Sequence, residues 1–148
     1  MPTRHLSRII VVQSLYEWSF HNYEKEKCQE IFERNLQEFG QDIDEPDFGR
    51  NLIKGIIENL ETIDQILKES IKSLPYEQVP LLEKSILRLA VYELLNESEA
   101  TPHKVSINEA IEIAKNFGTT ATAKFINGVL GTVYENIQKT KNEKKSSS

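Results

Sequence analysis

Basic side chains gather at both ends of this chain, where they could bind an anion such as a phosphate group. Arg4, His5 and Arg8 are spaced so that in a helix they would share one face. Residues 101–148 carry seven lysines against four glutamates, whereas residues 21–100 carry twice as many acidic as basic side chains. If the two ends meet in the folded protein, they would form a local anion-binding face despite the net charge of −5.

Helices are the elements that would position these side chains, because apolar residues recur at helical spacing and no segment alternates as a half-buried strand would. The stretch 81–95 is apolar on nearly every side and is predicted to be a central helix. Its Arg88 and Glu93 are predicted to form internal ion pairs, since an unpaired buried charge is costly. We predict an all-α, single-domain bundle of about six helices over residues 1–138, with a disordered lysine- and serine-rich tail at 139–148. The predicted helices cover about residues 4–20, 27–39, 46–74, 81–95, 106–117 and 120–137.

The last two predicted helices would meet at a tight polar turn near the second basic group. Ser106 and Glu109 have the spacing of a capping box, which favours a helix start there over a catalytic role for the glutamate. Gly118 is predicted to end that helix in a left-handed conformation, and one of the threonines of 119–120 is predicted to cap the next. Gly128 costs roughly 1 kcal/mol relative to alanine inside a helix, which predicts another backbone passing close to it.

The sequence motifs typical of enzymes, metal sites and membrane proteins do not occur in this chain. The three histidines are scattered, Cys28 is the single cysteine, and no zinc-binding, glycine-rich nucleotide-binding or nucleophile motif occurs. No apolar run is long enough to cross a bilayer, and the first residues do not form a convincing signal peptide. We therefore expect a cytoplasmic protein that is not an enzyme and uses no metal, cofactor, small-molecule substrate or membrane.

Three segments of the chain resemble the bacterial NusB family of transcription antitermination factors. They are RHLSRIIVVQSLYEW at 4–18, LEKSILRLAVYEL at 82–94, and VSINEAIEIAKNFG with KFINGVL inside 105–130. The resemblance implies a helical bundle in two packed halves that binds RNA without catalysing a reaction. Family members bind single-stranded boxA RNA of ribosomal RNA leader transcripts together with NusE, a small-subunit ribosomal protein. With other Nus factors on RNA polymerase, they let ribosomal RNA operons be transcribed past terminators.

The resemblance also implies two sets of binding residues. Basic side chains would contact phosphates, and an aromatic side chain would stack on an unpaired base. The chain departs from the family at positions that are often basic, which hold His5 and Leu6 here. We therefore expect weaker electrostatic anchoring, more dependence on NusE, or help from the lysine tail. The residues implied in RNA binding are Arg4, His5, Arg8, Gln13, Lys124, Phe125 and Asn127, and those implied in NusE binding are Tyr16 and Glu83.

Other interpretations stay open at this stage. Phe125 could pack in the core, Asn127 could satisfy buried backbone, Tyr16 could be a half-buried core residue, and Glu83 could be a solvated helix residue. The whole chain could be a helical scaffold that binds proteins but not RNA, or a NusB-like module of the kind found in ribosomal RNA methyltransferases. RNA binding that grows with NusE and falls with salt would separate an antitermination factor from a scaffold.

Overall fold

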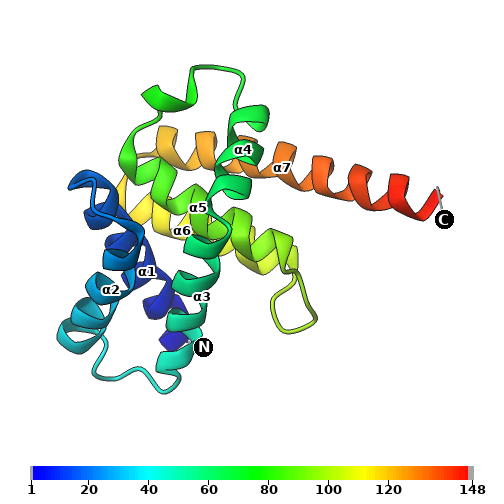
Figure 1. Cartoon of the computed structure of the whole chain (residues 1–148). Helices are drawn as coiled ribbons and strands as arrows, with labels where there is room; N and C mark the ends of the chain where they lie inside the picture. Colours follow the sequence, from blue (N-terminus) through cyan, green and yellow to red (C-terminus); the bar gives the residue numbers. More distant parts are fainter. Residues whose placement is uncertain (1, 147–148) are drawn as a thin grey trace.

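The computed structural model describes residues 2–146, and this part of the chain is all-helical, which confirms the predicted fold class (Figure 1). None of its helices is long and apolar enough to cross a membrane. The described elements are α1 (Pro2–Phe20), α2 (Lys25–Phe39), α3 (Pro46–Glu58), α4 (Leu60–Ser70), the 3₁₀ helix η1 (Tyr76–Gln78), α5 (Leu81–Leu95), α6 (His103–Phe117) and α7 (Thr120–Ser146).

The helices form two packed halves around α5. The first three helices pack against one another, and α4, α5, α6 and α7 form the second half. Because α5 also packs against α1 and α3, it has neighbours on nearly every side, as its apolar sequence predicts. Ile86, Leu87 and Leu94 of α5 are fully buried.

Arg88 and Glu93, the two buried charged residues of α5, form internal ion pairs, as predicted, and their partners lie on other helices. The Arg88 guanidinium donates to the Asp64 carboxylate of α4 at 2.9 and 3.1 Å. Glu93 accepts two hydrogen bonds from Arg8 of α1, at 2.9 and 2.8 Å. These two pairs therefore tie α5 to both halves of the bundle.

The predicted single helix over 46–74 is wrong, because two helices occupy that stretch. The break lies at Asn59, whose side-chain amide donates to the carbonyl of Gly55 at 2.8 Å. An asparagine that bonds its own backbone competes with the helical ladder, so an apolar stripe can continue through a break. The second helix then ends at Ser70, because Ile71 adopts an extended conformation.

The start of α6 differs from the predicted capping box. The helix begins at His103, and the carboxylate of Glu97 accepts the His103 backbone N–H at 2.9 Å. Ser106 is buried one turn inside the helix, where its hydroxyl has no hydrogen-bond partner among the described residues. Glu109 points instead to α1, so the capping-box prediction is wrong.

The turn between α6 and α7 follows only part of the prediction. Thr119 caps α7, since its hydroxyl accepts the Thr122 N–H at 3.2 Å and its own N–H donates to the Thr122 hydroxyl at 3.0 Å. The φ of Gly118 is −128°, which is not left-handed; a Cβ there would lie 2.7 Å from the Thr122 hydroxyl, so close packing explains this glycine. A Cβ on Gly128 would meet nothing within 4 Å, so the predicted close backbone is also wrong.

The first helix ends in a Schellman motif that shapes the surface beside it. Asn22 adopts a left-handed φ of 55°, which asparagine tolerates better than most residues. Its N–H donates to the Ser19 carbonyl at 3.1 Å, and the Tyr23 N–H donates to the Trp18 carbonyl at 3.3 Å.

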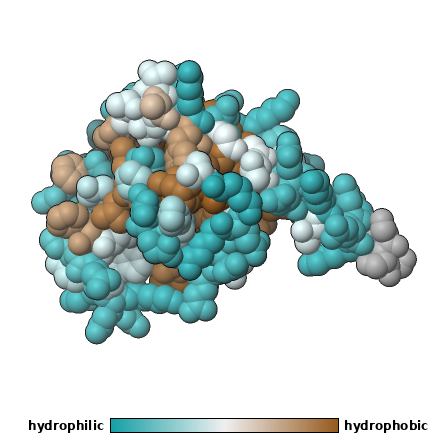
Figure 2. Space-filling model, turned by 90° about the horizontal axis from the view of Figure 1, so that it is seen from above, coloured by the Kyte–Doolittle hydropathy of each residue, from teal (hydrophilic) through white to brown (hydrophobic). Residues whose placement is uncertain are grey.

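The last helix continues through residues 139–146, which the sequence predicted to be disordered, and it projects beyond the body of the molecule (Figure 1). Extending an existing helix gains one hydrogen bond for each residue fixed, and Lys144 and Lys145 in the last turn oppose the negative end of the helix dipole. This projecting end is hydrophilic, whereas apolar side chains reach the surface on the body (Figure 2). The rest of the predicted tail, residues 147–148, lies outside the described residues.

Candidate nucleic-acid interface

Arg4 lies on the surface at the start of α1, where its side chain contacts Glu45 and Phe48. Its Nε donates to the Glu45 carboxylate at 2.9 Å, and its guanidinium lies 4.5 Å from the centre of the Phe48 ring. The side chain is still 38% exposed. Arg4 can therefore reach a ligand, provided that the ligand competes with Glu45.

His5 is paired with an acidic residue of α6. Its Nδ1 is hydrogen-bonded to a carboxylate oxygen of Glu109, and both side chains are partly exposed. The other carboxylate oxygen lies 4.0 Å from the Arg8 guanidinium. The carboxylate of Glu109 thus neutralises part of the basic group that opens the chain.

Arg8 does not lie on the predicted phosphate-binding face. Its side chain is 4% exposed, and both of its short hydrogen bonds go to Glu93. Burial acts to lower the pKa of Arg8, but the hydrogen bond and charge of Glu93, with the charge of Glu109, raise it overall, so the pair stays ionised. The predicted phosphate contact is corrected to an internal ion pair, whose partner stands 85 positions away in the sequence.

The second predicted group lies in the first turns of α7. Lys124 and Asn127 are exposed, so Asn127 does not serve buried backbone. Phe125 is half-buried and packs against the core, which leaves part of the side chain open to solvent. The preceding turn, residues 118–123, carries no acidic side chain. A phosphate that approaches this turn would therefore meet no carboxylate from residues 118–123.

Helix α6 lies between the two predicted groups in the chain contacts that connect them. Glu109 contacts His5, whereas Phe117, at the end of α6, lines the same hollow as Gln13. The ten residues from Glu109 to Thr119 span about 15 Å at the helical rise. We propose that Arg4, His5, Gln13, Lys124 and Phe125 contribute to one surface, which we call the basic strip.

An apolar hollow of about 360 Å³ opens beside Gln13, where α1, α5 and α6 meet. Tyr16 is 41% exposed and Phe117 48%, so the hollow is open and Tyr16 is not a core residue. Glu83, one residue from the hollow on α5, is half-buried, and burial raises the pKa of its carboxyl. The residues lining the hollow are Ile9, Val12, Gln13, Tyr16, Leu82 and Phe117.

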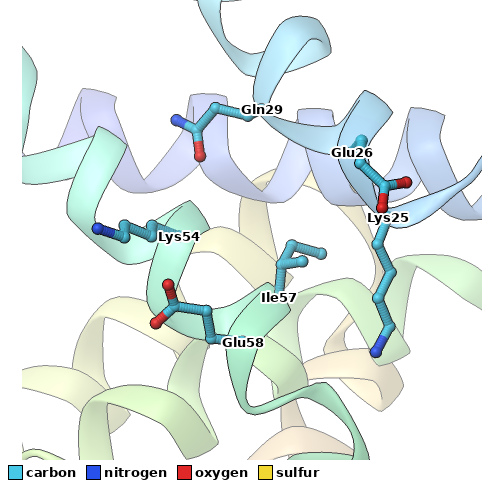
Figure 3. A pocket seen from close by; sticks show the side chains of 6 residues that line it. All are labelled: Lys25, Glu26, Gln29, Lys54, Ile57 and Glu58. Atoms are coloured by element: carbon cyan, nitrogen blue, oxygen red, sulfur yellow. The ribbon is translucent and has the colours of Figure 1, made fainter.

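A larger hollow, of about 390 Å³, lies between α2 and α3 and contains none of the predicted site residues (Figure 3). Its Lys25 and Lys54 point in different directions, and Ile57 lies between them. Nowhere in residues 2–146 do three histidine, cysteine, aspartate or glutamate side chains gather as a metal ion would require.

The chain is similar in sequence to one protein family along most of its length. The model of the NusB family matches residues 5–135. Transcription antitermination protein NusB of Chloroflexus aggregans is 38% identical over 131 residues, which cover 88% of this chain and 85% of that protein. The Bacillus cereus protein of the same name is 37% identical over 134 residues, covering 90% of this chain and 98% of the relative.

Solved structures share the fold. NusB of T. maritima is 31% identical and superposes with a TM-score of 0.76, covering 89% of this chain and 90% of that one. A structure described as antitermination factors NusB and NusE in complex with dsRNA is 24% identical, with a TM-score of 0.79 over 92% of this chain and 98% of that one. At that identity the second likeness concerns the fold alone.

Proposed function

This chain belongs to the NusB family of transcription antitermination factors, and from that membership we propose that it binds boxA RNA of ribosomal RNA leader transcripts together with NusE. In this proposal it acts in the cytoplasm, with other Nus factors on RNA polymerase, and promotes transcription of ribosomal RNA operons. A similar fold solved with NusE and RNA supports the choice of partners.

The observation that carries the RNA proposal is the exposed corner at the start of α7. Lys124 presents an ammonium group beside a turn without acidic side chains, and Phe125 next to it is partly open. A single-stranded base can stack on such a ring, which contributes roughly 1–3 kcal/mol per base, while the lysine contacts a phosphate. Asn127, one turn of helix away, supplies an amide for a base edge or a phosphate.

The other end of the basic strip would contact the same RNA more weakly. Arg4 and His5 each have a carboxylate partner in the free protein, so a phosphate must displace Glu45 or Glu109 before it contacts either side chain. Arg8 contributes no contact, because it is buried against Glu93. RNA affinity should therefore depend strongly on the partner protein.

The proposed NusE site is the apolar hollow with Tyr16 at its rim. Its exposed rings, Tyr16 and Phe117, offer the kind of aromatic anchor that protein interfaces favour. Glu83 beside it forms no ion pair among the described residues, and a basic residue of NusE would stabilise its partly buried carboxylate. The hollow also adjoins Gln13, so NusE bound there would lie beside the basic strip and could extend it.

Titrating boxA RNA against the protein, with and without NusE and at two salt concentrations, tests this proposal. We expect weak binding by the protein alone, stronger binding with NusE, and a loss of affinity as salt rises, because phosphate contacts release counterions. A scaffold that binds only proteins would bind NusE but would not bind boxA RNA at either salt concentration.

A further inference from the structure

A second, polar pocket lies beside the apolar hollow, between the end of α1 and the start of α5. It has a volume of about 210 Å³, and two of its lining side chains are cationic. No acidic side chain lines it, although the chain as a whole is acidic. Its lining residues are Trp18, Ser19, Asn22, Tyr23, Leu81, Lys84 and Arg88.

The two cations of this pocket differ in how firmly they are held. Arg88 is fixed, since it donates to the carboxylate of Asp64 and, at 2.9 Å, to the Ser19 hydroxyl. Lys84 has no carboxylate within 4 Å in residues 2–146, and its ammonium lies 4.6 Å from the centre of the Tyr76 ring. Burial, and then the charge of Arg88, lower the pKa of Lys84, and these effects outweigh the charges of Asp64 and Glu77, which act to raise it.

The polar pocket and the apolar hollow belong to one continuous surface. Leu81 lines the pocket and the next residue, Leu82, lines the hollow. A row of aromatic rings also joins them, from Tyr16 at the hollow to Tyr23 at the pocket. In this row Tyr16 stacks on Phe20 at 6.3 Å, Phe20 meets the His21 ring edge-on at 5.2 Å, and His21 stacks on Tyr23 at 5.1 Å.

We propose that Lys84, backed by Arg88, receives an aspartate or glutamate carboxylate of the protein that covers the apolar hollow. This inference rests on the proposed function, which seats NusE on that hollow. A protein bound over the row of rings would strip water from the Lys84 ammonium, and an ammonium buried without an anion is strongly unfavourable. A carboxylate at the same place would hold the charge and fix the register of the two proteins.

Glu83, which precedes Lys84 in α5, indicates a second charge that the partner surface should carry. Neither Glu83 nor Lys84 forms a direct ion pair in residues 2–146, although the charges of Asp64 and Glu77 act on Lys84 from further away. The free surface therefore presents two opposite charges, adjacent in the sequence, that a partner can still pair. The matching surface would carry an apolar or aromatic anchor for the hollow, a basic residue facing Glu83 and an acidic residue facing Lys84.

Calorimetric titration of NusE into the full chain tests this inference, with fluorescence of Trp18, the chain's single tryptophan, as a second signal from inside the pocket. We expect Lys84→Gln to weaken NusE binding about tenfold or more, Lys84→Glu to weaken it further, and Lys84→Arg to retain most of the affinity. The matched control is Lys54→Gln, which removes an exposed lysine of α3 and should leave NusE binding unchanged. Circular dichroism of each variant shows that the bundle is intact.

The outcomes separate this inference from the proposed function. If the wild-type protein binds NusE and Lys84→Gln binds it as tightly as Lys54→Gln does, the carboxylate site is overturned while the proposed function stands. If wild type does not bind NusE, the partner proposal and this inference fall together. A change in Trp18 fluorescence with inorganic phosphate that needs Lys84, with NusE affinity independent of Lys84, would make the pocket a small-anion site and also overturn the inference.

Discussion

Arg8 and Glu93 join the first helix to the central helix through two hydrogen bonds, of 2.9 and 2.8 Å, with both side chains only 4% exposed. This pair fixes the position of α1 against α5. It thereby holds His5 at the surface beside α6 and Arg4 beside the start of α3. The guanidinium of Arg8 could bind a phosphate, but in this structure it is buried and positions two partly exposed residues that can bind one.

Replacing Arg8 by alanine should destabilise the fold. The change leaves the Glu93 carboxylate buried without its partner, which typically costs about 3–5 kcal/mol. Urea unfolding followed by circular dichroism measures this effect, and Arg4→Ala is the matched control because Arg4 is exposed. Unchanged stability together with abolished RNA binding would show that Arg8 contacts RNA after all.

Replacing Glu109 by glutamine should increase RNA affinity several-fold. The carboxylate of Glu109 competes with phosphate for His5, and at low salt the removal of one negative charge beside an RNA contact is worth roughly 1 kcal/mol. Glu45→Gln should act in the same direction through Arg4. Filter binding of boxA RNA at low salt measures both variants, and Glu112→Gln, an exposed residue of α6, is the control. Equal increases for all three variants would point to overall charge instead of these two contacts.

Replacing Phe125 by aspartate should abolish RNA binding while leaving the helices formed. The half-buried ring would no longer supply its stacking contribution of roughly 1–3 kcal/mol per base, and the new carboxylate would repel phosphate. RNA binding by the NusE complex and far-ultraviolet circular dichroism are measured on the same sample. If the variant unfolds, Phe125 is chiefly a core residue, and the stacking role has to be abandoned.

The Glu97 carboxylate should make stability depend on pH in the acid range. Hydrogen bonds from the backbone and ring of His103 lower the pKa of Glu97 below its ordinary value of 4.5, since they favour the charged form. This contribution is therefore complete above about pH 4.5 and disappears as pH falls through the lower value of the folded protein. Thermal unfolding of wild type and Glu97→Gln should differ above about pH 4.5, and the difference should shrink as the pH falls below that value. A difference that does not change with pH would exclude this role for the carboxylate.

Periodic apolar residues were sufficient to predict the helical fold and the central place of α5. They did not reveal the break at Asn59, because the apolar stripe runs through it while the side-chain amide bonds the Gly55 carbonyl. Nor did local spacing locate the start of α6, where the capping carboxylate comes from Glu97, six positions before His103.

The candidate site was predicted less completely than the fold, since charge and spacing do not show which partner a side chain meets. The partners of Arg8 and His5 stand 85 and 104 positions away, so only the folded chain distinguishes a paired arginine from an exposed one. The polar pocket at Lys84 was missed for the same reason, because its lining comes from the end of α1 and the start of α5. The sequence signal that could have indicated this pocket is Lys84, a lysine in the largely apolar segment that forms α5.

The binding of boxA RNA by the complex with NusE, measured across a range of salt concentrations, tests the basic strip most directly. We predict that the double variant Arg4→Gln/Lys124→Gln binds more weakly than wild type. Its plot of log affinity against log salt should be shallower by about 0.7 for each phosphate that the variant no longer neutralises. The double variant Lys54→Gln/Lys72→Gln removes two exposed lysines elsewhere and should match wild type in slope. Equal slopes for all three proteins, or no RNA binding by wild type at low salt, would contradict the assignment of this surface to RNA.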